Sequence, residues 1–154
     1  MKTGSATIEI KARPREVWDA LTDVTRVGEW SPECLAARWV PDAIGPAVGA
    51  KFEGDNEVRI AGRVMKRWTT TSEVTACEPP SRFEFVAAGY TTWSYELEPT
   101  ADGTRVTETF SYEPKGFTGV VYEVLLRRSK MMTKGMQRTL TKVKAKLETT
   151  VAPT

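Results

Sequence analysis

The segment from Gly116 to about Thr149 most constrains the fold, because it has the pattern of one long amphipathic helix. Its apolar residues recur at steps of three and four, and no proline interrupts them. These residues are Phe117, Val120, Val121, Val124, Leu125, Met132, Met136, Val143 and Leu147. A helix with such a stripe has one face that must be buried against another layer of structure.

The same face carries residues that a helix built only for packing does not need. At about 100° per residue, Arg128 falls within the apolar arc, together with Gly135 and Thr139. A packing helix favours Leu and Ala at such positions, since they fill space and support the helical backbone. The pattern is typical of a helix that lines a cavity, with Arg128 as a polar anchor.

Upstream of this segment, short stretches alternate apolar and polar residues with the period of β-strands. Clusters of Gly, Pro, Asp and Asn separate them, including Gly54-Asp55-Asn56, so we expect an antiparallel meander. Two short helices are expected after the first strand, one from Pro14 and one over Val24–Glu29. The predicted strands are Thr7–Ala12, Cys34–Val40, Ala50–Glu53, Glu57–Ile60, Met65–Ala76, Arg82–Val86, Thr91–Glu98 and Thr104–Tyr112.

This order of elements predicts an α+β fold in a single domain over residues 1–154. A curved antiparallel sheet of about seven strands has one apolar face to cover, and the terminal helix carries the matching stripe. We therefore expect the sheet to wrap around that helix, an arrangement that readily leaves a pocket between the two layers.

Composition narrows the class of protein. The 154 residues are 40% hydrophobic and 27% charged, with a net charge of +2, as in an ordinary soluble domain. The excess of Lys and Arg lies mainly between Arg127 and Lys146, on an expected solvated helix face, so no nucleic-acid partner is expected. No stretch approaches the roughly 20 apolar residues that span a bilayer, and no signal peptide begins the chain, so we expect a cytoplasmic location.

Residue types that many reactive centres need are missing. The sequence has no histidine, and its two cysteines, Cys34 and Cys77, do not form a Cys-x-x-Cys pair. Neither a metal site nor a dithiol centre is therefore expected. Glycine-rich nucleotide loops and the Gly-x-Ser-x-Gly motif are also absent, so no cofactor is expected.

Several short motifs, in this order, resemble the SRPBCC superfamily, also called START-like or Bet v 1-like proteins. The resemblance runs from about Thr3 to Leu147 and is closest to the bacterial polyketide cyclase/dehydrase-like branch. It implies a helix-grip fold, with the sheet wrapped around the C-terminal helix, and a pocket for a hydrophobic ligand. The motifs are Pro14-Arg15-Glu16-Val17-Trp18, Glu29-Trp30-Ser31-Pro32, Gly49-Ala50-Lys51-Phe52, Trp68 through Val74, Glu78-Pro79-Pro80 and Gly103-Thr104-Arg105-Val106-Thr107.

Alternate side chains of the predicted strands share the face that carries the apolar residues. Aromatic residues recur on that face across four strands; each alone fits a packed core, but the set favours the wall of a ligand pocket. The resemblance places Trp30 near the pocket entrance. The predicted ligand-binding residues are Trp30, Trp68, Phe85, Trp93, Tyr95, Glu108, Phe110, Tyr112, Arg128 and Met132.

Glu108 and Arg128 each lie on the apolar face of their own element, where an unpaired charge is costly. One interpretation is a structural ion pair, or side chains that extend to the cavity mouth. The other is functional: Arg128 holds an oxygen of the ligand while Glu108 orients it. If burial raises its pKa, Glu108 is also a candidate general base, with Tyr95 or Tyr112 as proton donor.

These features predict a carrier or sensor that binds a hydrophobic small molecule, such as a lipid, a fatty acid or an aromatic polyketide-like metabolite. The alternative is an enzyme of the polyketide cyclase, aromatase or dehydratase type. A third possibility is a partner-binding module, which a large exposed apolar patch outside the pocket would indicate. The sequence is compatible with a monomer or a homodimer.

Overall fold

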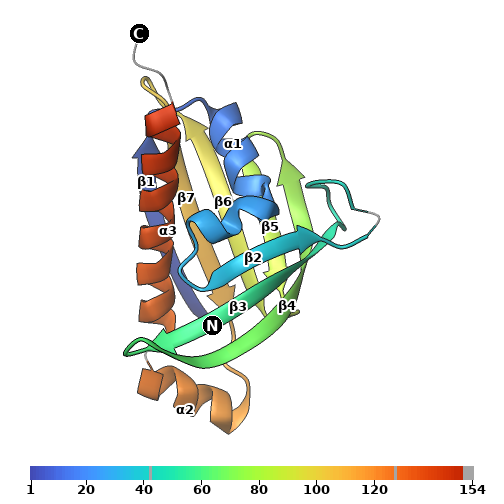
Figure 1. Cartoon of the computed structure of the whole chain (residues 1–154), viewed down its shortest axis with the longest axis vertical. Helices are drawn as coiled ribbons and strands as arrows, with labels where there is room; N and C mark the ends of the chain where they lie inside the picture. The colour runs from blue at the N-terminus through green and yellow to red at the C-terminus, as the bar shows by residue number, and fades with distance from the viewer. Residues whose placement is uncertain (42, 127, 151–154) are drawn as a thin grey trace.

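The computed structural model describes residues 1–41, 43–126 and 128–150. Seven antiparallel strands form one sheet in the order β1-β7-β6-β5-β4-β3-β2. Helices lie over one face of this sheet, with α3 along β1 and with α1 and η1 beside it (Figure 1). The elements are β1 (Lys2–Ile10), α1 (Pro14–Thr22), η1 (Val24–Glu29), β2 (Cys34–Trp39), β3 (Lys51–Ile60), β4 (Arg63–Glu78), β5 (Arg82–Ala87), β6 (Thr91–Pro99), β7 (Thr104–Tyr112), α2 (Gly116–Leu126) and α3 (Arg128–Thr150).

The predicted α+β helix-grip architecture is confirmed. The sheet is antiparallel and open, the two short helices follow the first strand, and a long C-terminal helix packs against the sheet. The second short helix, η1, is a 3-10 helix whose start is capped by the Asp23 carboxylate, which accepts a hydrogen bond from the Thr25 amide. None of the helices in the described ranges is long and apolar enough to cross a membrane.

The core lies between the sheet and the two helices α1 and α3. Pro14 occupies the first turn of α1, where no amide donor is needed, and the helix then buries Val17 and Trp18. The Trp18 ring meets Phe83 of β5 edge-on, with centroids 6.0 Å apart. The largest fully buried side chains are Phe83, Phe110, Ile10, Met136, Leu140, Val17, Val74, Val106 and Val143.

The prediction of one continuous helix from Gly116 to Thr149 is wrong. The segment forms two helices, α2 and α3, and α2 turns away below the lower end of α3 (Figure 1). Phe117 and Val120 are consequently exposed, whereas Met136 and Val143 of α3 are buried. Among the described side chains of the stripe, the buried ones are Met136, Val143 and Leu147, and all three lie on α3. Val124 and Leu125 are also assigned to the stripe, but their side chains are not among those that the structure describes.

The predicted turn at Gly54-Asp55-Asn56 is also wrong, because these residues lie within the continuous strand β3. Each pairs with β4 in regular antiparallel register, Gly54 with Thr70 and Asn56 with Trp68. A Cβ on Gly54 would lie only 3.1 Å from the Cys34 Sγ of β2, so the glycine accommodates the neighbouring edge strand. Tertiary contacts here override the turn preference of the three residue types.

Strand β1 begins earlier than predicted, because its pairing with β7 runs without interruption from Lys2 opposite Tyr112 to Ile10 opposite Thr104. Gly4 lies opposite Phe110 in this ladder. A Cβ on Gly4 would collide with the Phe110 ring and with the Thr133 hydroxyl of α3. The missing side chain thus lets α3 approach the sheet.

Candidate functional site

A continuous aromatic surface crosses the sheet on the face that the helices cover. Register places Phe85 opposite Trp93, and Trp93 opposite Phe110. The ring centroids of Trp93 and Phe110 lie 5.7 Å apart, and Tyr112 stacks against Phe110 at 5.9 Å. Four of the predicted wall residues therefore lie side by side.

Part of this surface is buried and part is accessible. Phe83 and Phe110 are buried, whereas Phe85, Trp93 and Tyr95 are only half-buried. Because these three side chains belong to the inward face of the sheet, their accessible area faces the space between the sheet and the helices. These rings are therefore less completely covered than those of a tightly packed core.

A carboxyl–phenol pair lies within this surface. Tyr95 of β6 is directly opposite Glu108 of β7, and its hydroxyl donates a hydrogen bond of 2.8 Å to Glu108 Oε1. Glu108 is only 3% exposed. Its second oxygen, Oε2, is buried without a hydrogen-bond partner among the described residues. A buried polar atom in that state is costly unless a proton, a water molecule or a ligand compensates it.

The electrostatics of the pair favour a protonated carboxyl group. Burial raises the pKa of Glu108 to about 8, and the hydrogen bond from Tyr95 only partly opposes this shift. Burial, and then the adjacent Glu108 carboxylate, raises the pKa of Tyr95 well above its ordinary value. At neutral pH both groups therefore hold their protons, and Oε2 presents an O–H donor toward the interior.

Arg128 and Met132 come from the first turns of α3, and both are half-buried. The positive charge of Arg128 acts on Glu33, just before β2; burial raises the pKa of Glu33, and Arg128 partly opposes that shift. The structure thus associates Glu108 with Tyr95, and Arg128 with the segment that leads into β2.

Gly135 on α3 faces the segment before β2 and leaves room there for one methyl group. A Cβ there would lie 3.6 Å from Cγ of Pro32, an ordinary van der Waals distance. Thr139, the other small residue of the arc, bonds its hydroxyl to the Gly135 carbonyl at 2.9 Å. The gap therefore marks where the segment before β2 approaches α3.

Two predicted residues lie apart from the carboxyl–phenol pair. Trp30 is buried at the end of η1, and the Arg26 guanidinium lies 5.0 Å above its ring. Trp68 is half-buried on the part of β4 that extends beyond β5, and the Lys66 ammonium lies 5.3 Å from its ring centre. No described contact brings either ring to Tyr95 or Glu108.

The structure adds polar residues that sequence reasoning missed. The Asn56 amide donates to Thr70 Oγ1 at 2.9 Å, linking β3 to β4. The half-buried Cys34 thiol is close enough to Tyr95 to act on its pKa, and burial raises the pKa of Cys34 itself. Phe52, Gly54 and Asn56 occupy alternate positions, which could have indicated that Asn56 shares the inward face with Phe52. The turn predicted at Gly54-Asp55-Asn56 excluded that interpretation.

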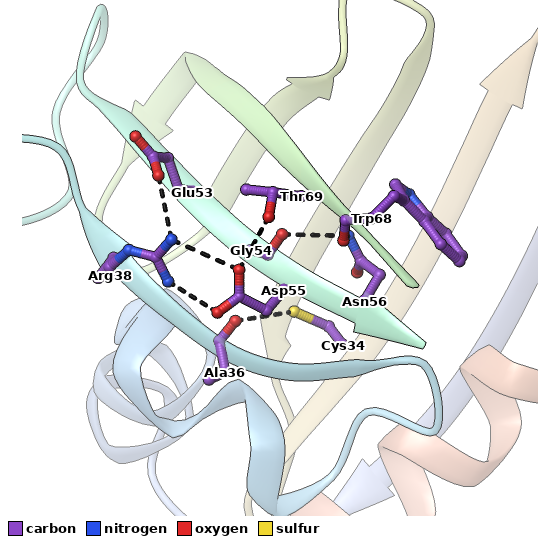
Figure 2. A network of polar contacts seen from close by, with 9 residues as sticks. All are labelled: Cys34, Ala36, Arg38, Glu53, Gly54, Asp55, Asn56, Trp68 and Thr69. Atoms are coloured by element: carbon purple, nitrogen blue, oxygen red, sulfur yellow. Dashed lines mark hydrogen bonds and ion pairs between the residues drawn. The ribbon is translucent and has the colours of Figure 1, made fainter. Parts of the chain in front are cut away.

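The opposite face of the same strands carries an ion cluster. Figure 2 shows the Arg38 guanidinium of β2 between Glu53 and Asp55 of β3, at 3.1 Å and 2.9 Å. The Thr69 hydroxyl of β4 donates to Asp55 at 3.1 Å. These contacts tie the edge strand β2 to its neighbours, and the hydrogen bond from Arg38 lowers the pKa of Asp55. The cluster is structural support for the strands that carry Cys34 and Asn56.

A separate hollow of about 460 Å³ opens at the surface between α1, η1 and the β2–β3 connection. Arg15, Trp18, Asp23, Trp39 and Pro46 are among the residues that line it. None of the ten predicted ligand-binding residues contributes to this lining. Within the described ranges, no three Cys, Asp or Glu side chains gather as they would around a metal ion.

Comparison with known proteins agrees with this architecture. A family model described as "Polyketide cyclase / dehydrase and lipid transport" matches residues 1–148. The chain belongs to this family. The SRPBCC resemblance predicted from the sequence motifs is thereby confirmed. No curated protein matches the chain significantly.

Several solved structures share the fold. A Polyketide_cyc-like protein from Corynebacterium glutamicum is 34% identical in sequence, and the match covers 95% of this chain and 91% of the C. glutamicum chain. The two structures superpose with a TM-score of 0.66. An AHSA1-like protein from Aeromonas hydrophila is 22% identical over 96% and 92% of the two chains, with a TM-score of 0.66. A putative protein from the dynemicin biosynthetic locus, DynU16, is 19% identical over 97% and 48%, with a TM-score of 0.62.

Proposed function

We propose that this protein carries or senses a hydrophobic small molecule, such as a lipid, a fatty acid or an aromatic polyketide-like metabolite. The observation that carries the proposal is the unpartnered Glu108 oxygen within an inward aromatic surface that stays partly accessible. A ligand that lies against Phe85 and Trp93 would bury apolar area and place an oxygen near Glu108. The family description, which names lipid transport, supports the same class of ligand.

The carboxyl–phenol pair selects the polar group of that ligand. The Tyr95 hydroxyl donates its hydrogen bond to Glu108 Oε1, which leaves a lone pair on the phenol oxygen, and the protonated carboxyl group carries its O–H on the opposite oxygen. One donor beside one acceptor suits a carbonyl or hydroxyl group. We therefore propose a mostly apolar ligand that carries a neutral oxygen near its midpoint or end.

Arg128 supplies the second polar contact in this proposal. Arginine stays charged when partly buried, and its planar fork fits a carboxylate or phenolate oxygen. Since Arg128 is half-buried at the start of α3, it would receive the acidic end of a fatty acid or an acidic metabolite. Glu33 is its electrostatic neighbour in the described structure, so ligand binding would change that interaction.

The first test is to extract and identify what the purified protein holds, by native mass spectrometry and organic extraction. Titration with a fluorescent fatty acid and with a neutral polyene hydrocarbon then separates the two polar contacts. Arg128→Met should weaken binding of the fatty acid by roughly 2 to 5 kcal/mol and leave binding of the hydrocarbon unchanged. Lys130→Met, an exposed neighbour on α3, is the matched control. No saturable binding of either probe would contradict the proposal.

An enzyme of the cyclase, aromatase or dehydratase type is the second candidate. It is favoured by the buried Tyr95–Glu108 pair, joined by a 2.8 Å hydrogen bond, in which burial raises the pKa of Glu108 toward the working range of a general acid or base. The Tyr95 hydroxyl beside it can hold or return a proton on an enolate oxygen. The sparse polar groups would otherwise act by folding a poly-β-ketone chain.

Glu108→Gln distinguishes the two candidates. A carrier should retain binding within a few-fold, because the amide keeps an acceptor for Tyr95 and supplies an N–H donor in place of the carboxyl O–H. A general acid–base enzyme should lose roughly two to four orders of magnitude in rate on a model poly-β-ketone. Equal turnover by the wild type and the variant would exclude Glu108 as the proton-transfer group.

A further inference from the structure

The β3–β4 hairpin extends well beyond the rest of the sheet. Strand β5 pairs with β4 only from Ser72 onward, whereas β3 pairs with β4 down to Ile60 opposite Arg63. The segment from Arg63 to Thr71 is therefore half of a two-stranded ribbon. Figure 1 shows its tip at the lower end of the molecule, at the same end as α2.

Large apolar side chains are exposed at this end. Ile60 and Met65, at the ribbon tip, are 57% and 61% exposed, and Phe117 on α2 is 85% exposed. Val64 and Val120 accompany them on the same two elements. We call this set the apolar tip; it consists of Ile60, Val64, Met65, Phe117 and Val120.

Cations surround the apolar tip. The ribbon segment from Glu57 to Trp68 contains four cations, Arg59, Arg63, Lys66 and Arg67, against one carboxylate. That carboxylate, Glu57, is buried and paired with both Arg59 and Arg67. The Arg59 hydrogen bond lowers the pKa of Glu57, so the carboxylate stays charged within this pairing. The tip therefore presents net positive charge.

Lys115, at the start of α2, adds a further cation at this end and lies 5.6 Å from the Tyr90 ring centre. Lys130 of α3 is exposed as well. Protruding apolar side chains with a border of Lys and Arg are what an anionic bilayer surface binds: the apolar groups enter the headgroup boundary, and the cations meet lipid phosphates. A nucleic acid would contact the cations through its phosphates but would not bury the protruding apolar side chains.

We propose that the apolar tip and its basic border dock this protein on an anionic membrane surface. The docked orientation directs the ribbon tip and α2 into the headgroup region and leaves α1, η1 and the opposite end of the sheet in water. This docking goes beyond the proposed function, because it depends on exposed side chains and requires no bound cargo.

Vesicle flotation with the full chain tests the docking. Two preparations are compared, phosphatidylcholine alone and phosphatidylcholine mixed with phosphatidylglycerol. The protein should bind the mixed vesicles, and binding should weaken steeply as salt rises, because screening shortens the reach of surface charges. Equal binding to both preparations, or none to the anionic vesicles at low salt, would overturn the proposal.

Two tip variants and two controls locate the surface. Arg63→Glu with Lys66→Glu should lower partitioning at least about tenfold, because each cation near an anionic surface contributes substantially. Met65→Ser with Phe117→Ser should also lower it several-fold by removing inserted apolar area. Ile44→Ser and Lys142→Glu, exposed away from the tip, should bind as the wild type does.

All four variants change exposed side chains, so each should keep the far-ultraviolet circular dichroism and melting temperature of the wild type. Among folded variants, control substitutions that weaken binding as much as the tip substitutions would overturn the assignment of the surface. So would an apolar-tip variant that binds like the wild type. An empty interior found by lipid extraction would contradict the proposed function and leave the docking result unaffected.

Discussion

At the scale of single residues, the decisive feature is a carboxyl group whose ordinary ionisation is suppressed. Glu108 is buried beside Tyr95, and only one of its oxygens has a described partner. Water would stabilise the charged form of this group, but burial removes that water and raises the pKa to about 8. In both proposed functions, the role of Glu108 depends on this protonated state.

The raised pKa predicts how stability depends on pH. The unfolded chain releases the Glu108 proton near the ordinary value of 4.5, whereas the folded chain retains it to about 8. Between these values the folded state binds more protons, so Glu108 should reduce stability as pH rises, by roughly 1.4 kcal/mol per pH unit. Above about pH 8 this contribution becomes constant.

Urea denaturation of the wild type and of Glu108→Gln across this range measures the effect. The glutamine variant cannot ionise, so its stability relative to the wild type should increase with pH between about 4.5 and about 8. Parallel stability curves for the two proteins would show that Glu108 titrates normally.

Tyr95→Phe should destabilise the protein by about 1 to 3 kcal/mol, because the Glu108 Oε1 loses its buried hydrogen-bond donor. The pKa of Glu108 should rise further, since the Tyr95 hydrogen bond holds it down. Chemical denaturation and a carboxyl-resolved NMR titration measure the two effects. Tyr90→Phe, on another half-buried tyrosine, serves as the control.

At the scale of elements, the space around Gly135 and Gly4 shows how closely α3 packs against its neighbours. Gly135 lies in the middle of α3, where glycine costs conformational entropy, and the space beside it accepts a methyl group at 3.6 Å from Pro32. Gly135→Ala should therefore stabilise the protein by about 0.5 to 1 kcal/mol. A lowered melting temperature in differential scanning calorimetry would show that the gap has another purpose.

Gly4→Ala should have the opposite effect. The added methyl group collides with Phe110, which is fully buried, and with Thr133 on α3, so the helix or the strand must shift. Overpacking of this kind costs about 1 to 3 kcal/mol. Since the two substitutions are chemically identical, comparing their free energies of unfolding separates local helix propensity from the fit between layers.

At the scale of the whole molecule, the proposed ligand should act as a linked stabiliser. A ligand that binds only the folded protein adds about 2.7 kcal/mol when present at a hundred times its Kd. For a chain of this length, that corresponds to a rise of several degrees in Tm. Thermal denaturation of extracted protein, with and without added fatty acid, measures the effect; an unchanged Tm at saturating fatty acid would count against an internal site.

Much of the fold could be predicted from the sequence because its signals are local. The strand from Thr104 to Tyr112, the helix that begins at Pro14 and the short helix over Val24–Glu29 follow from side-chain period and turn chemistry alone. Antiparallel order follows from short connections. The motif order pointed to the family, and that prediction is confirmed over residues 1–148. The ligand-binding role of the ten site residues stays a prediction.

Tertiary structure decided what depends on distant partners. Gly54-Asp55-Asn56 forms part of a strand because Arg38, Thr69 and Thr70 satisfy its polar side chains. The predicted stripe is divided between two helices because the sheet lies under α3, whereas α2 lies past the lower end of α3. Tyr95, rather than Arg128, is the hydrogen-bond partner of Glu108 because register places those strands together. A local pattern encodes the period of an element, whereas the contacts of its side chains depend on how the elements pack.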